Sequence, residues 1–173
     1  MSSLLELSLD ELKQRLEAEA AGPARAALEV EVGRRHVRVG AHDQALRQFA
    51  SAHQTYTEAG DRQAAARVEA DIGDACSYKG EHDRATAYLA RALETADELG
   101  DNDLRARALA LLGEQALRRG ELDRAADLFD AARVHFDHYW NGAELARCLV
   151  GLALCACEAG RLVEAQGLIG DAV

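Results

Sequence analysis

A forty-residue period runs through most of this 173-residue chain. Glycine recurs four times at this interval, and alanine and large apolar residues recur in series of their own. Several series of residues keep the same forty-residue spacing over four copies. This indicates tandem repeats, in which each repeat is a supersecondary unit that stacks on its neighbours. The series are Gly40, Gly80, Gly120 and Gly160; Ala26, Ala66, Ala106 and Ala146; Ala45, Ala85, Ala125 and Ala165; and Phe49, Leu89, Phe129 and Ile169.

Each repeat is predicted to be a pair of helices, and the second repeat shows the pattern. Apolar residues follow a helical spacing over residues 62–79. Gly80 then ends this first helix, because glycine is favoured just past a helix C-terminus. Asp83 is the predicted N-cap of a second helix over residues 84–99.

Small residues mark the place where the two helices of a repeat cross. In the second repeat these are Gly73 and Ala85, and a larger side chain at either would force the helices apart. Leu89, four residues further on, is predicted to fill the space towards the next repeat. The same three positions recur one period later, in the third repeat.

Residues 1–23 precede the repeats and are predicted to contain a helix. Ser8 and Glu11 have the spacing of a capping box. We expect this helix to cover the first repeat, because terminal repeats need a polar outer face; a free docking helix is the alternative. Its apolar stripe is Leu9, Leu12 and Leu16.

This arrangement of small residues, turn glycine and large apolar residue resembles the tetratricopeptide repeat. The forty-residue unit is similar to the longer repeats of kinesin light chains and of bacterial regulators of the MalT and Rap type. The resemblance implies an all-α fold: a right-handed superhelical solenoid of four helix-turn-helix repeats with an N-terminal capping helix. The four repeats would span about residues 24–61, 62–101, 102–141 and 142–173.

The resemblance also implies a function in binding. Proteins with this repeat hold a protein or peptide along a concave groove lined by the first helices. Two alternatives stay open: a ligand- or peptide-sensing domain of a larger bacterial regulator, and a self-assembling structural unit. The sequence lacks the usual phosphate-binding, hydrolase and zinc-protease motifs, so we expect no enzyme activity, no cofactor and no metal.

Charge and composition narrow the partners further. The net charge of −10 argues against nucleic acid and against an anionic membrane surface. No apolar stretch reaches transmembrane length and no signal peptide is evident, so we expect a cytoplasmic protein. Arginine outnumbers lysine 18 to 2, which suggests a GC-rich bacterial genome. We expect the cysteines to be small buried residues rather than zinc ligands: Cys76, Cys148, Cys155 and Cys157.

Arginines recur at one position of three predicted first helices: Arg67, Arg107 and Arg147. One interpretation is an electropositive groove that binds an acidic segment of a partner, since arginine pairs carboxylates well. The other is a set of internal ion pairs with carboxylates such as Asp71, Asp74 or Glu114. The candidate groove residues are Arg34, Arg38, Arg67, Asp74, Tyr78, Arg107, Glu114, Arg118 and Arg147.

The last repeat has a short second helix that begins near Leu162. Apolar residues on it would lie uncovered in an array of four repeats, and exposed apolar surface often marks an interface. We therefore predict either self-association into a homo-oligomer or a further helix that covers this face. The residues of the predicted face are Leu168, Ile169 and Val173.

Overall fold

The computed structural model describes residues 7–138 and 142–171. In these residues it has nine helices and no strand, which confirms the predicted all-α repeat fold. Helix α1 precedes four helical hairpins, α2–α3, α4–α5, α6–α7 and α8–α9. The helices are α1 (Leu9–Ala18), α2 (Pro23–Arg38), α3 (His42–Glu58), α4 (Arg62–Tyr78), α5 (His82–Leu99), α6 (Asn102–Arg118), α7 (Leu122–His138), α8 (Gly142–Glu158) and α9 (Leu162–Asp171).

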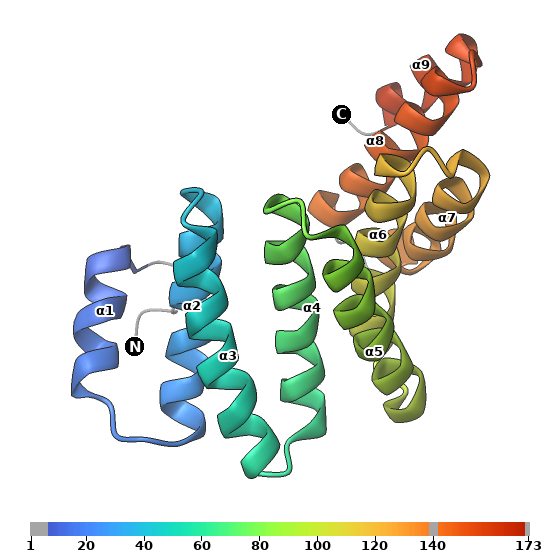
Figure 1. Ribbon diagram of the computed structural model, residues 1–173. Coiled ribbons are helices and arrows are strands. Elements are labelled where there is room, and N and C mark those ends of the chain that lie inside the picture. The colour runs from blue at the N-terminus through green and yellow to red at the C-terminus, as the bar shows by residue number, and fades with distance from the viewer. Residues whose placement is uncertain (1–6, 139–141, 172–173) are drawn as a thin grey trace. The chain divides into compact units, whose positions relative to one another are not determined.

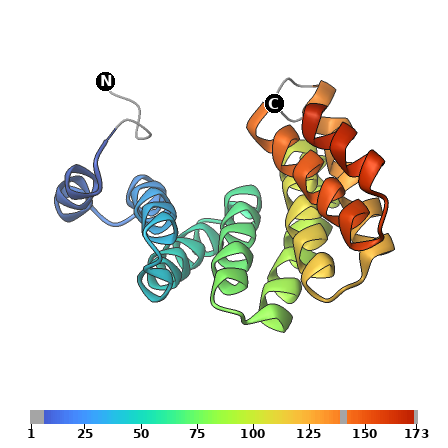
Figure 2. The ribbon, with the colours of Figure 1, turned by 90° about the horizontal axis from the view of Figure 1, so that it is seen from above.

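The helices form two compact units, residues 1–91 and 92–173, with the boundary inside α5. In the first unit α3 packs against both α2 and α4, and these two also contact each other (Figure 1). In the second unit α6, α7, α8 and α9 follow the same order of packing (Figure 2). Each unit therefore contains a pair of neighbouring first helices, α2 with α4 and α6 with α8.

The turn inside each hairpin is a Schellman motif built on the repeated glycine. Gly80 has φ 78°, and the amide of the next residue, Glu81, donates to the carbonyl of Cys76 at 2.9 Å. The chain then enters α5 at once, at His82. The sequence-based N-cap at Asp83 was therefore wrong: this aspartate lies in the first turn, where its charge suits the helix dipole.

Aspartates cap the first helices of the second and third repeats, α4 and α6. The side chain of Asp61 accepts a hydrogen bond from the amide of Ala64, and Asp101 does the same for Leu104. Ser8 and Glu11 form the predicted capping box of α1, and Leu12 and Leu16 of α1 are buried on α2. The position of α1 is also held by Arg25, whose guanidinium donates to the carbonyls of Leu16 and Glu19.

The helices of one hairpin cross at glycine. A Cβ atom at Gly33 would lie 2.4 Å from the ring of Phe49, and one at Gly73 would lie 2.7 Å from Leu89. In the first three hairpins the large residue of the second helix therefore packs against the backbone of its own first helix. Phe49 and Phe129 are 0% and 1% exposed, so they form the centre of the hydrophobic packing in their units.

The predicted apolar face of the fourth hairpin is only partly as expected. Ile169 is 50% exposed. Leu168, which we expected on this face, instead packs partly buried against alanines of its own hairpin, Ala153, Ala156 and Ala165. Val173 lies outside the described residues. Self-association through this face stays a prediction.

The cysteines differ in their surroundings. Cys76, Cys148 and Cys155 are buried, as expected, and burial raises the pKa of the Cys148 thiol to about 12. Cys157 is exposed, so the expectation was wrong for this residue. It lies two positions after Cys155 and therefore points away from the side of α8 that packs on the core.

Candidate functional site

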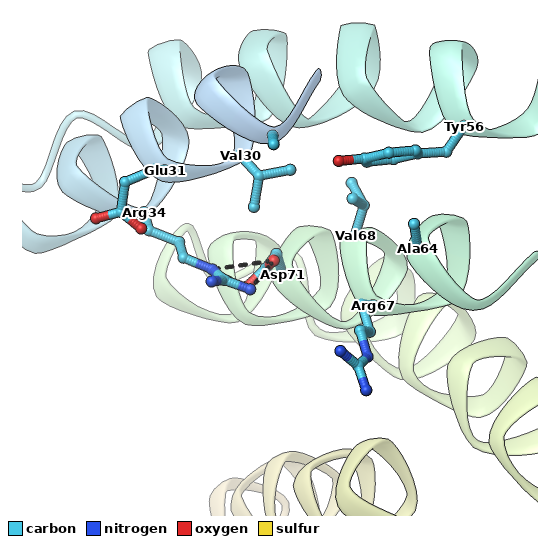
Figure 3. Close-up of a pocket in the computed structure, with 9 residues that line it drawn as sticks. Val30, Glu31, Arg34, Tyr56, Ala64, Arg67, Val68 and Asp71 are labelled. Carbon is cyan, nitrogen blue, oxygen red and sulfur yellow. Dashed lines mark hydrogen bonds and ion pairs between the residues drawn. The ribbon is translucent and has the colours of Figure 1, made fainter. Parts of the chain in front are cut away.

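A groove lies between α2 and α4, and we call it the α2–α4 groove (Figure 3). It encloses about 360 Å³. Val30 and Val68 supply apolar surface, and the ring of Tyr56 reaches it from α3 (Figure 3). Its lining residues are Ala27, Val30, Glu31, Arg34, Tyr56, Ala64, Arg67, Val68 and Asp71.

An ion pair bridges the two helices of this groove. The guanidinium of Arg34 on α2 donates to both carboxylate oxygens of Asp71 on α4, at 2.9–3.2 Å (Figure 3). The Asp71 side chain is only 2% exposed, while that of Arg34 is 41% exposed. A buried carboxylate needs such a partner, because its desolvation is otherwise costly. The pair therefore links α2 to α4. It also leaves part of the Arg34 guanidinium exposed in the groove.

Further charges surround the groove. The carboxylate of Glu31 is buried and accepts from Arg35 at 2.9 Å, with Arg38 at 3.5 Å. Arg67 is exposed and extends from α4 away from Tyr56 (Figure 3). Burial and the carboxylate of Asp61 raise the pKa of the Tyr56 hydroxyl. Tyr56 therefore stays protonated at neutral pH and can donate a hydrogen bond.

A second groove lies between α6 and α8, and we call it the α6–α8 groove. It encloses about 570 Å³. Leu117, Val150 and Leu154 make its lining more apolar than that of the first groove, and both Val150 and Leu154 are nearly half exposed. The complete lining is Glu114, Leu117, Arg118, Phe129, Ala143, Ala146, Arg147, Val150, Gly151 and Leu154.

The α6–α8 groove also has an ion pair between its two helices, but the acidic and basic residues are exchanged between the earlier and the later helix. Here the carboxylate is on the earlier helix, and Arg147 on α8 donates to Glu114 on α6 at 2.7 Å. Glu144 lies 3.6 Å from Arg147, and Arg118 lies 3.9 Å from Glu114. Glu114 stands two repeats after Arg34, and Arg147 stands two repeats after Arg67. Asp71 and Gly151 share a third position in the same way, while the other lining residues of the two grooves come from different positions of the repeat.

The predicted groove residues fall into two sets. Arg34 and Arg67 line the α2–α4 groove, and Glu114, Arg118 and Arg147 line the α6–α8 groove. Arg38 lies at the end of α2 near Glu31, and the exposed Tyr78 stacks on His42 with ring centroids 5.6 Å apart. Asp74 is half-buried on α4 and Arg107 is half-buried on α6. The arginine ladder spanning all three repeats stays a prediction, since Arg67 belongs to one unit and the other two arginines to the second.

Sequence reasoning missed the apolar half of both grooves. Leu154 occupies the repeat position that is polar in the other three copies, as Arg34, Asp74 and Glu114. That change from a charged to an apolar residue was visible in the register and would have singled out the α6–α8 groove. Tyr56 and Val30 carried no such signal, because apolar residues at their positions also suit core packing.

Comparison with solved structures identifies the fold. BtubC from P. vanneervenii superposes with a TM-score of 0.71 at 19% identity over 94% of this chain and 68% of its own. Rap, in complex with competence and sporulation factor, gives a TM-score of 0.85 at 20% identity over 95% of this chain. A kinesin light chain of Podospora anserina with nearly identical repeats gives 0.69 at 14% identity, over 95% of this chain and 82% of its own.

The fold is tetratricopeptide-like. The predicted resemblance is therefore confirmed for the fold, and this tetratricopeptide-like array spans about half, 47%, of the Rap chain it matches. No family model and no curated protein matches the sequence. Within the described residues, no helix has the length and apolar character needed to cross a membrane. The same residues contain no cluster of three or more metal-ligating side chains.

Proposed function

We propose that this tetratricopeptide-like array binds a segment of a partner protein or peptide on the face formed by its first helices. The α6–α8 groove carries the proposal, because Val150 and Leu154 are exposed apolar side chains inside a recess rimmed by charge. Binding sites combine apolar surface with a few polar groups in this way. Tetratricopeptide-like folds commonly mediate protein–protein interaction, which agrees with the proposal.

The apolar contact is tested with peptides selected on the protein from a displayed random library. Val150→Asp combined with Leu154→Asp should weaken binding of the selected peptides at least tenfold, because burying a valine or leucine contributes about 1.5–3 kcal/mol and about 1.4 kcal/mol is a factor of ten. Val134→Asp is the matched control, since Val134 is 61% exposed on α7 and does not line the groove. Fluorescence anisotropy measures the affinities, and circular dichroism checks that each variant is folded. Affinities of the double variant within twofold of the original would contradict the proposed site.

The finer proposal concerns an acidic segment of the partner engaging Arg67, Arg107 and Arg147. In the α6–α8 groove Arg147 already pairs with Glu114 at 2.7 Å, so a partner carboxylate has to compete with an internal one. Glu114→Gln removes that competitor's charge and leaves the side chain nearly unchanged in size. We expect Glu114→Gln to tighten the binding of acidic peptides about threefold or more at low salt, with the gain shrinking as salt rises. Unchanged affinity would mean that Arg147 serves the array internally.

The alternative function, a sensing domain of a larger bacterial regulator, draws on the similarity to Rap in complex with competence and sporulation factor. It uses the same first-helix face and differs in what binding does. In a sensing domain, peptide binding would change the affinity for a second protein. The selected peptides can therefore test both functions. If peptide binding changes the affinity of the array for a second protein, the result favours sensing over simple docking.

A further inference from the structure

The α2–α4 groove contains two alanines at repeat positions that hold larger residues in other copies. Ala27 on α2 and Ala64 on α4 both line the groove. The larger residues at these positions are Arg67, Arg107 and Arg147 for Ala27, and Leu104 and Glu144 for Ala64. The groove lies between two neighbouring helices that contact each other directly. Its space is therefore a local feature of the first two repeats.

Tyr56 on α3 adds a hydroxyl group that packing does not need. The hydroxyl points into the groove towards Val30 (Figure 3). The same repeat position holds Leu16, Ala96 and Phe136, so an apolar residue is sufficient for packing there. Among the described residues the Tyr56 hydroxyl makes no hydrogen bond. A donor of this kind inside an apolar recess is what fixes the orientation of a ligand in a binding site.

The charges of the groove are already matched within the array. Both carboxylate oxygens of Asp71 accept hydrogen bonds from Arg34, and the carboxylate of Glu31 accepts from Arg35. The lining holds two arginines and two carboxylates, so its formal charge is zero. An ionised side chain would lose its hydration here without a net charge to attract it. An apolar side chain instead gains from contact with the valines of the lining.

We infer that the α2–α4 groove binds one uncharged aliphatic residue of a partner segment. Its side chain lies between Val30 and Val68, and a backbone carbonyl beside it accepts a hydrogen bond from Tyr56. The volume of about 360 Å³ accommodates one such residue with its two peptide groups. The inference rests on the proposed function, because it names the residue that the first-helix face of the first unit takes from the partner.

The probe is N-acetyl-leucine N-methylamide, which is one aliphatic side chain between two peptide groups. It is titrated into the full chain with ¹³C-labelled valine methyl groups, and the methyl chemical shifts are followed by NMR. We expect saturable shifts at Val30 and Val68, with a dissociation constant on the order of 1 mM for a ligand of this size. The glutamate and lysine analogues of the probe should not saturate over the same concentrations.

The repeat itself supplies variants that should fold, because each residue already stands at the same position of another copy. Ala64→Leu and Ala27→Arg fill the groove and should abolish saturable binding of the leucine probe. Tyr56→Phe removes only the hydroxyl and should weaken binding about fivefold, the effect of one neutral hydrogen bond. Val134→Asp on α7 is the control and should leave binding unchanged, since Val134 does not line the groove.

The inference is overturned if the leucine probe does not saturate, if Ala64→Leu binds it equally well, or if the glutamate analogue binds more tightly. Unchanged affinity of Tyr56→Phe would likewise overturn the assigned hydrogen bond. The proposed function fails by a different result, because the selected peptides test Val150 and Leu154. The chain with Val150→Asp and Leu154→Asp should still bind the leucine probe. Shifts of the probe at Val150 in place of Val30 and Val68 would contradict the inference while supporting the α6–α8 groove.

Discussion

Gly151→Ala should lower the free energy of unfolding by about 1–2 kcal/mol, although alanine is the better helix former. The new Cβ atom would lie 2.5–2.7 Å from three ring atoms of Phe129. The ring has little room to move away, because Gly113 lies so close that a Cβ atom built there would be 3.1 Å from it. Overpacking costs about 1–3 kcal/mol, which exceeds the gain of about 1 kcal/mol in helix propensity. Urea unfolding followed by circular dichroism measures the difference.

Two other glycines provide matched controls for Gly151. A Cβ atom at Gly113 would require the Phe129 ring to move by only a few tenths of an ångström. The free energy of unfolding of Gly113→Ala should therefore be close to that of the original protein. At Gly167 on α9 no atom lies within 4 Å of the new Cβ, and Gly167→Ala should stabilise by about 0.5 kcal/mol. Adding Phe129→Leu to Gly151→Ala should relieve the clash, so the double variant should be about as stable as Phe129→Leu alone. A stabilising Gly151→Ala would contradict the close approach of α7 and α8.

Arg34→Leu should destabilise the first unit by about 3 kcal/mol, the cost of leaving a buried carboxylate without its main cation. Asp71 is 2% exposed and receives three hydrogen bonds from Arg34. Asp71→Asn should cost less, about 1 kcal/mol, because Arg34 is 41% exposed and water can solvate it. Thermal unfolding of the two single variants tests this asymmetry.

The double variant Arg34→Leu with Asp71→Leu should recover most of the lost stability, because replacing a buried ion pair by apolar residues is often neutral. The repeats already carry leucine at both positions in other copies, as Leu154 and Leu111. This experiment also separates the two interpretations of the groove arginines. If Arg34→Leu is stable but binds acidic peptides more weakly, Arg34 binds the partner. If Arg34→Leu is destabilised, Arg34 serves as an internal ion-pair residue of the array.

The repeat register was sufficient to predict the helices, the inner turns and the crossing glycines. The reason is that these features depend on local rules: a glycine with positive φ ends a helix, and only small residues let two helices cross closely. The start of α1 was predictable for the same reason, since Ser8 and Glu11 form a local capping box. The start of α5 was misjudged at Asp83 because a Schellman turn leaves no separate linker before the next helix.

The pairing of charges and the recesses between helices depended on tertiary structure. Arg34 and Asp71 are far apart in the sequence, and only the packing of α2 on α4 brings the guanidinium to the buried carboxylate. The sequence placed arginine at Arg147 but could not show that Glu114 holds it at 2.7 Å, because long side chains choose among several neighbours in the folded array. Likewise the exposure of Ile169, against the burial of Phe129 at the same repeat position, follows from whether another helix packs on that face. Sequence alone therefore determined the repeat and its helices, while the contacts between neighbouring helices decided which repeated positions are buried, paired or open to a partner.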